Sequence, residues 1–101
     1  MTRAAKSGNQ RTVLIENALG QDFGAVRAKI YGTGGSIRVR IIDPTFAGLS
    51  RVERERLVRP LVHRLPKDVQ SDITVLLLLA PGEERTSLMN LEFEQSSKSG
   101  L

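Results

Sequence analysis

The chain has 101 residues, of which 40% are apolar and 26% are charged, and its net charge at pH 7 is +4. This length and composition fit one small globular domain and nothing larger. The absence of cysteine excludes disulfides, thiol nucleophiles and cysteine-based zinc or iron–sulfur sites, and the single histidine, His63, excludes sites built on several histidines.

The first part of the chain is predicted to be a leader followed by a helix. Residues 1–10 are small and polar, so we expect a disordered leader without the apolar stretch of a signal peptide. Apolar residues at helical spacing then predict a helix over Thr12–Leu19, which Gly20 ends. No apolar run approaches the ~20 residues that span a bilayer, and we expect a cytoplasmic protein.

Two segments of alternating pattern follow, Ala25–Tyr31 and Ile37–Ile42, and the glycine-rich Gly32–Ser36 between them predicts a β-hairpin. The outer face of this hairpin carries four cations and one aromatic residue, namely Arg27, Lys29, Tyr31, Arg38 and Arg40. Such a face suits nucleic acid, because cations follow phosphates and an aromatic ring stacks on a base. The alternatives are a solvated face, or a face covered by the acidic C-terminal residues Glu92 and Glu94.

The next helix has a clear start. Ser50-Arg51-Val52-Glu53 has the pattern of a capping box, in which Ser50 and Glu53 each bond the other's amide. Leu57, Val58, Leu61, Val62 and Leu65 form an apolar stripe, which predicts one helix that kinks at Pro60 rather than dividing there. Arg54 lies in the middle of this stripe and requires a salt bridge or a carbonyl partner, whereas His63 lies nearly opposite.

The last elements complete the predicted fold. Pro66–Asp72 is a polar connection or one short turn of helix, and Ile73–Ala80 is apolar on both faces, as in a buried strand. Ser87–Phe93 alternates loosely and predicts either an added strand or a segment that covers the last strand. The order helix, strand, strand, helix, strand predicts an α+β two-layer sandwich, αββαβ, with a mixed three-stranded sheet and the helices on one face.

One segment resembles a known family. Phe46–Val58 is similar to the BolA signature, which is Phe-x-Gly-x-Ser, three residues, Arg-His, two residues, then Val or Ile. The residues that we assign to this motif, with the cap partner included, are Phe46, Gly48, Ser50, Glu53, Arg54 and Val58. The resemblance covers a domain over residues 11–83 and leaves 84–101 as a C-terminal extension with a disordered tail.

This resemblance implies a type II KH-like fold and a partnership with monothiol glutaredoxins in iron–sulfur and iron homeostasis. For bacterial members it also implies DNA binding and transcriptional control of morphology and the stress response.

The chain departs from the family where the chemistry lies. The signature's histidine is Glu55, the position of the family's metal-ligand histidine falls near Asp72, and the hairpin loop that supplies the second ligand has neither cysteine nor histidine. A carboxylate is a poor substitute for these donors, so we expect no metal and no cluster. Ser50 is a cap without a neighbouring base, and we expect no catalytic residue.

The residues therefore predict a non-catalytic binding or regulatory domain without a cofactor. Its partner is left open between nucleic acid at the basic hairpin face and protein. The protein partner is either a monothiol glutaredoxin bound without a shared cluster, another protein, or a second copy that docks through Leu88–Phe93. The oligomeric state is also left open.

Overall fold

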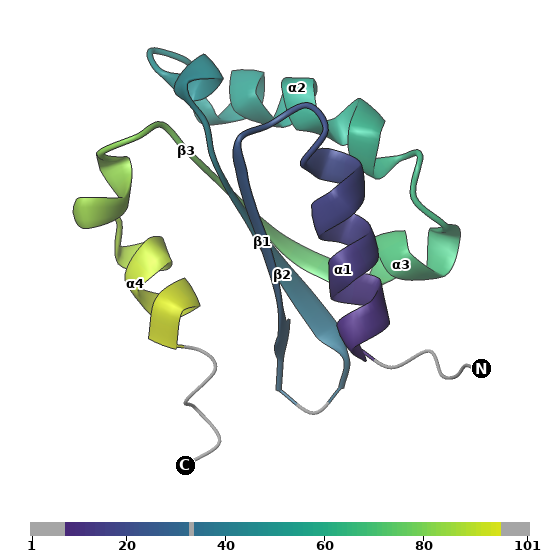
Figure 1. The fold of residues 1–101 in the computed structure, drawn as a ribbon. Helices are drawn as coiled ribbons and strands as arrows, with labels where there is room; N and C mark the ends of the chain where they lie inside the picture. Colours follow the sequence, from purple (N-terminus) through teal and green to yellow (C-terminus); the bar gives the residue numbers. More distant parts are fainter. Residues whose placement is uncertain (1–7, 33, 96–101) are drawn as a thin grey trace.

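The structure is a computed structural model that describes residues 8–32 and 34–95. It has an α+β fold with a three-stranded sheet and four α-helices (Figure 1). In chain order the elements are α1 (Gly8–Leu19), β1 (Ala25–Tyr31), β2 (Ser36–Ile42), η2 (Pro44–Phe46), α2 (Arg51–Val62), α3 (Lys67–Asp72), β3 (Ile73–Leu79), η3 (Glu83–Arg85) and α4 (Leu88–Gln95).

The sheet has the strand order β1-β2-β3, with β1 and β2 antiparallel and β2 and β3 parallel. The prediction of a hairpin followed by a helical crossover is therefore confirmed. The register between β2 and β3 shifts by one residue after Ile37. Ile37 pairs with Ile73, whereas the next residue, Arg38, pairs with Val75. Thr74 is thus an extra residue in β3, as in a β-bulge.

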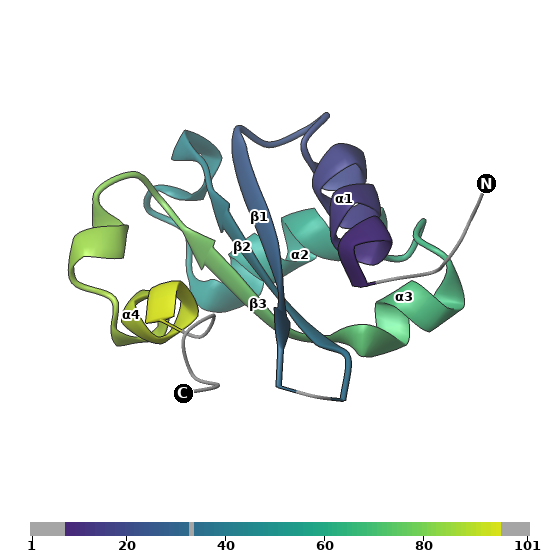
Figure 2. The same cartoon turned by 60° about the horizontal axis from the view of Figure 1, so that its bottom comes forward.

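The main core lies between the sheet and α1, α2 and α3, which cover one face together (Figures 1 and 2). Alternation places Ile37, Val39 and Ile41 of β2 in this core, and all three are fully buried. The helices contribute Ile15 and Val58, which are fully buried as well. Both helices expected on this face are present, and the polar connection before β3 forms the short helix α3.

Helix α2 bears out most of its predicted features. The capping box is present, since the Glu53 N–H donates to Ser50 Oγ at 3.1 Å and the Ser50 N–H donates to Glu53 Oε1 at 2.8 Å. The helix continues through Pro60 without dividing, and His63 is exposed. One member of the expected apolar stripe differs, because Leu57 is 43% exposed. The side of α2 that packs on the sheet is the one that carries Val58 and Val62, and Leu57 lies beside it.

Two boundaries differ from the predictions. Helix α1 begins at Gly8, so residues 8–10 are helical rather than part of a leader, and residues 1–7 lie outside the described part of the chain. The C-terminal extension forms helix α4 rather than an added strand. Ser87 explains why a helix begins here, because its Oγ accepts the Asn90 N–H at 3.0 Å, as the side chain of a helix cap does.

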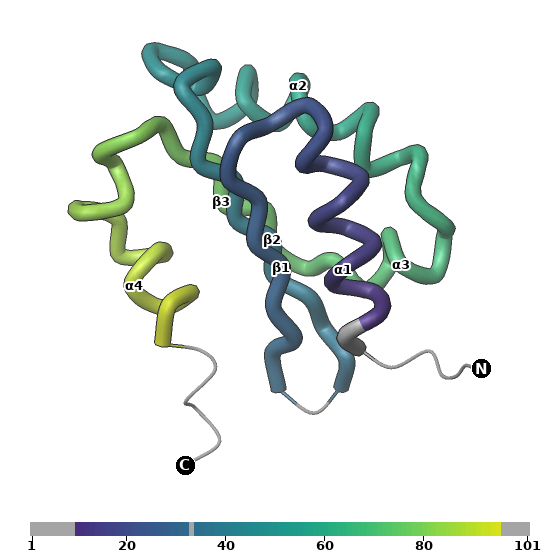
Figure 3. Tube along the Cα trace, in the orientation of Figure 1, coloured from purple at the N-terminus to yellow at the C-terminus, as the bar shows by residue number. Residues whose placement is uncertain are grey.

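Helix α4 also lies on the opposite face of the sheet from the other three helices, as the tube in Figure 3 shows. Its Phe93 packs with Leu77 and Leu79 in a second, smaller apolar cluster, against which Ile42 is partly buried. The two predicted helices, α1 and α2, share one face as expected, whereas α4 was not predicted to be a helix. The second alternative, a segment that covers the last strand, is correct, because β3 presents apolar side chains on both of its faces.

Candidate nucleic-acid interface

The four cations of the hairpin lie on one sheet face in two directly opposed pairs. Arg27 of β1 pairs in register with Arg40 of β2, and Lys29 pairs with Arg38. The alternation of the two strands points these side chains away from the main core. The sequence prediction that they share a face is thus confirmed, and their register makes each cation the direct neighbour of another.

Helix α4 covers two of these cations. Arg40 Nη1 donates to Asn90 Oδ1 at 2.8 Å and also to a carboxylate oxygen of Glu94. Lys29 Nζ donates to the carbonyl oxygen of Phe93 at 3.0 Å. The Arg40 side chain is left 15% exposed. We refer to Lys29 and Arg40 as the covered cations.

The ring of Phe93 adds a second kind of contact with the same two cations. Lys29 Nζ lies 4.7 Å and Arg40 Cζ lies 4.8 Å from the ring centroid, distances at which a cation is attracted to an aromatic face. The hydrogen bond from Arg40 is the main reason that the pKa of Glu94 is lowered, and the charges of Arg40, Lys29 and Arg27 lower it further. Helix α4 therefore presents a carboxylate, a carbonyl and a ring to the basic face.

None of the described residues covers the other half of the basic face in this way. Arg27 is exposed, and Arg38 lies over the ring of Tyr31 with its Cζ 3.5 Å from the centroid. Arg38 and Tyr31 are both half-buried and lie beside the hairpin turn. We refer to Arg27 and Arg38 as the uncovered cations. Of the alternatives for this face, cover by the acidic C-terminal segment is correct in part, through Glu94.

The residues of the expected family motif have structural roles. Phe46 and Val58 are fully buried, Gly48 has a φ of 79° that favours glycine, and Ser50 caps α2. The hydrogen bonds with Ser50 also lower the pKa of Glu53. None of these side chains contributes to the basic face.

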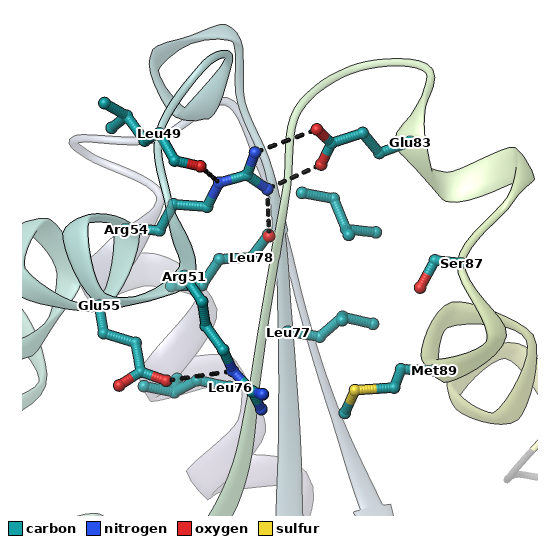
Figure 4. Close-up of a pocket in the computed structure, with 11 residues that line it drawn as sticks. Leu49, Arg51, Arg54, Glu55, Leu76, Leu77, Leu78, Glu83, Ser87 and Met89 are labelled. Atoms are coloured by element: carbon teal, nitrogen blue, oxygen red, sulfur yellow. Dashed lines mark hydrogen bonds and ion pairs between the residues drawn. The ribbon is translucent and has the colours of Figure 1, made fainter.

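Arg54 has the partners that its buried position requires. Its Nε donates to the Leu49 carbonyl at 3.0 Å and its Nη1 to the Leu78 carbonyl at 2.9 Å, while two nitrogens hold Glu83 in a bidentate pair (Figure 4). The hydrogen bonds from Arg54 and from the Ala80 N–H lower the pKa of Glu83 to about 2. Sequence reasoning identified the need for a partner but missed Glu83 itself.

A buried carboxylate, Asp43, was also missed. Its two oxygens accept the N–H of Gly24 at 2.7 Å and the N–H of Thr45 at 2.9 Å, which joins the entry of β1 to the turn after β2. Hydrogen bonds from Thr45 and Gly24 lower its pKa. The Asp-Pro-Thr sequence is the signal that would have found it, because an aspartate often caps such a turn.

Asp72, at the expected position of a lost metal ligand, forms an ion pair with Arg11 of α1. The same guanidinium lies beside the hairpin loop, since a Cβ placed at Gly35 would be 3.3 Å from Arg11 Nη2. A fixed cation thus fills the place between Asp72 and the loop, which is unfavourable for a metal ion. Within residues 8–32 and 34–95, no three side chains of His, Asp or Glu come together as a possible metal site.

No family model, no curated protein and no solved structure matches this chain. Among the residues that the structure describes, no helix is long and apolar enough to cross a membrane.

Proposed function

We propose that this chain is a non-catalytic, BolA-like domain of the type II KH-like arrangement that binds nucleic acid on its basic sheet face in competition with α4. The observation that carries the proposal is the register of the cations, with Arg27 opposite Arg40 and Lys29 opposite Arg38. Like charges at opposed positions destabilise a sheet unless an anion neutralises them. A face that keeps four such cations is suited to a ligand that brings negative charge.

Helix α4 resembles such a ligand in its chemistry. The Glu94 carboxylate takes the place of a phosphate, the Phe93 carbonyl supplies a neutral acceptor, and the Phe93 ring lies against cations as a base would. The fit is incomplete, because the buried Nε of Arg40 and that of Arg38 have no acceptor among the described residues. A nucleic acid with more acceptors would satisfy this face better than α4 does.

Helix α4 is also held weakly enough to leave. It has eight residues, fewer than the ~12–15 that an isolated helix needs to be even marginally stable in water. Phe93 and Asn90 are buried, whereas Leu88, Met89 and Leu91 are 79%, 43% and 52% exposed. Undocking exposes Phe93 and uncovers Leu77, Leu79 and Ile42 of the small cluster, and it breaks a few hydrogen bonds. With so few contacts, α4 belongs among the segments of low local stability.

The proposal includes binding without catalysis. Each group whose pKa is shifted, namely Asp43, Glu53, Arg54, Glu83 and Glu94, is held by a partner in a cap, a turn or an ion pair. A monothiol glutaredoxin remains a proposed protein partner, bound by contact without a shared cluster, since Arg11 neutralises Asp72. The proposed setting is the cytoplasm, with a role in transcriptional control during stress.

Fluorescence anisotropy with labelled single-stranded DNA, RNA and duplex DNA across a salt series tests the proposal. The double variant Arg27→Ala/Arg38→Ala should weaken binding and lower the slope of log affinity against log salt by up to about two on duplex DNA, since each phosphate contact contributes about 0.9. Phe93→Ala should tighten binding, because it releases α4 without changing the charge of the protein.

Two controls match these variants. Leu91→Ala removes an exposed apolar side chain from the same helix and should leave affinity unchanged, and Arg56→Ala/Arg64→Ala removes the same charge from exposed positions on and just beyond α2. Absence of binding at the lowest salt by both the wild type and Phe93→Ala would reject the nucleic-acid function. Equal effects of the two double variants would show that the attraction depends on net charge rather than on this face.

One observation favours a second function, that of a protein-interaction adaptor. The exposed apolar residues of α4, Leu88, Met89 and Leu91, form a surface that a partner or a second copy could cover. Association through this surface should be nearly insensitive to salt, in contrast to phosphate binding. Sedimentation velocity of the wild type and of Leu88→Ser/Leu91→Ser at low and high salt distinguishes the two functions.

A further inference from the structure

The two outer edges of the sheet differ in their protection. At the β1 edge, Glu16 of α1 reaches across, and its Oε2 accepts the N–H of Ala28 at 2.9 Å. At the β3 edge, side chains of the described residues protect backbone groups only near the carboxyl end of the strand. There Arg54 binds the Leu78 carbonyl and Glu83 accepts the Ala80 N–H at 2.9 Å.

The direction of the β3 backbone shows which groups face outward. The Leu79 carbonyl accepts the N–H of Asp43, on the β2 side. Because successive residues of a strand point their backbone groups to opposite sides, Leu78 and Leu76 face the open edge. Arg54 covers the carbonyl of Leu78, but no side chain of the described residues caps Leu76. An uncapped strand edge is a template for another strand.

A groove follows this edge (Figure 4). A hollow of about 390 Å³ lies along Leu76–Leu79, and a second hollow of about 300 Å³ lies along Ile73–Leu76. The two hollows adjoin at Leu76 and Glu55, and together they follow the uncapped part of β3 as a groove. The Arg54–Glu83 pair stands at one end of it.

The two walls of the groove differ in chemistry. On the α2 side, Arg51, Glu55 and Arg59 lie one turn apart, and Glu55 pairs with Arg51 at 3.8 Å and with Arg59 at 3.2 Å. With two arginines to one glutamate this wall has a net positive charge, and the side chains of Arg51 and Arg59 are 77% and 58% exposed. On the other side lie Leu77 of β3 and Met89 of α4, whose side chains point toward each other, so the lining there is apolar (Figure 4).

We infer that the open edge of β3 binds an extended segment of another protein as an added strand, and that acidic and apolar side chains alternate along this segment. In an added strand, alternate side chains point to opposite faces. One set would meet Arg51 and Arg59, and the other set would meet Leu77 and Met89. This site is separate from the basic face and does not depend on nucleic-acid binding.

A second copy of the chain fits the same edge less well. Glu55 lies level with Leu76, because both line the two hollows. A two-fold axis at Leu76 would therefore bring Glu55 against its copy and Arg51 against the Arg59 of the other chain. Like charges would meet along the whole helix, which disfavours this pairing.

The test uses a fluorescein-labelled peptide of the length of β3, seven residues, in which glutamate alternates with valine. Wild-type protein should bind it, and a peptide in which lysine replaces glutamate should bind more weakly. N-methylation removes amide donors, so methylation of the alternate amides that face β3 should abolish binding, whereas methylation of the other set should leave it intact. Equal binding of both methylated peptides, or binding of neither parent peptide, would overturn the inference.

Charge reversal provides the matched protein variants. Arg51→Glu/Arg59→Glu should weaken binding of the glutamate peptide by about tenfold, as expected for the loss of two exposed ion pairs, and should strengthen binding of the lysine peptide. Arg56→Glu/Arg64→Glu makes the same charge change at exposed positions away from the groove and should have little effect. An equal loss in the two variants would contradict a site at this edge.

Two other outcomes would assign the edge to a different occupant and so reject the inference. A dimer in sedimentation equilibrium that Arg51→Glu/Arg59→Glu dissociates, with no peptide binding, would make the occupant a second copy. Displacement of the bound peptide by a single-stranded oligonucleotide in the Arg27→Ala/Arg38→Ala background would make it a nucleic acid. Neither result depends on whether the basic face binds nucleic acid, so the two proposals can fail separately.

Discussion

Arg54, in the first turns of α2, and Glu83, just after β3, form a bidentate ion pair with N–O distances of 2.7 and 3.0 Å. The pair joins positions 29 residues apart and closes over the carbonyl of Leu78. The Arg54 side chain is only 13% exposed, so water has little access to its polar groups and to those of its partners. A polar connection therefore joins α2 to the end of the sheet, beside the apolar packing of Val58 and Val62 in the main core.

Removal of Arg54 should destabilise the domain. Arg54→Ala leaves the Leu49 and Leu78 carbonyls without their donor and Glu83 without its cation, and we expect a loss of about 2 kcal/mol in the free energy of unfolding. Urea denaturation measures this loss. Arg56→Ala, an exposed arginine of the same helix, is the control and should be close to wild type. Equal stability of the two variants would show that the pair contributes nothing.

The same pair predicts a dependence of stability on pH. The pKa of Glu83 falls from 4.5 to about 2 on folding, so the unfolded chain takes up a proton first as the pH decreases. The contribution of the pair is complete above about pH 4.5 and is lost as the pH falls toward 2. In Glu83→Gln this part of the acid limb should be reduced, as measured by urea denaturation at a series of pH values. An unchanged acid limb would contradict the assignment.

The capping box of α2 should contribute to stability and not to binding. Ser50→Ala removes the acceptor of the Glu53 N–H, and the usual cost of a lost cap is about 1 kcal/mol. Ser50→Asp is the matched control, because aspartate caps as well as serine does. If Ser50→Ala instead lost oligonucleotide or peptide binding at full stability, Ser50 would be a contact residue.

Helix α4 should open more often than the rest of the fold. Its backbone amides should exchange with deuterium faster than those of α2 or of β2, because α4 is short and is anchored mainly by Phe93. An oligonucleotide that displaces α4 should increase exchange there while it protects the hairpin strands. Exchange of α4 at the rate of β2, unchanged by oligonucleotide, would show that α4 is a fixed part of the fold.

The Arg11–Asp72 ion pair predicts that this chain does not ligate a shared cluster. When it is mixed with a cluster-loaded monothiol glutaredoxin, the absorption spectrum of the cluster should stay unchanged, even if the two proteins bind each other in size-exclusion chromatography. Asp72→His, which introduces an imidazole donor, is the informative comparison. A shifted spectrum with the wild type would show that carboxylate or backbone groups act as ligands here.

Several features could be predicted from neighbouring residues. The alternation of Val26, Ala28 and Ile30 identified a strand and placed Arg27 and Lys29 on its outer face, because side chains alternate along any strand. The Ser50–Glu53 box identified the start of α2, because both of its hydrogen bonds span three residues. Arg54 lies on the apolar stripe, so its guanidinium required a polar partner, although the neighbouring residues did not show which one.

The C-terminal segment shows the limit of such reasoning. Residues 87–93 alternate loosely enough for a strand, but Ser87 caps a helix there, and Phe93 finds Leu77 and Leu79 on the second sheet face. Nothing within a few residues of Phe93 indicates this contact. The exposed Met89 and Leu91 belong to the same alternation as Phe93, so local pattern alone cannot separate them from the buried residue.

By itself, the sequence determined the strands of the hairpin, the capped start of α2, the need for a partner at Arg54 and the cationic face, because each depends on residues within about one helical turn or strand. Tertiary structure alone decided that Glu83 is the partner of Arg54 and that Arg11 pairs with Asp72. It also decided that Glu94, 54 positions away in the sequence, covers Arg40. It left the β3 edge without a side-chain cap at Leu76 among the described residues, while Glu16 protects the β1 edge. These contacts join distant segments, and they form only where packing of the sheet against its helices brings those segments together.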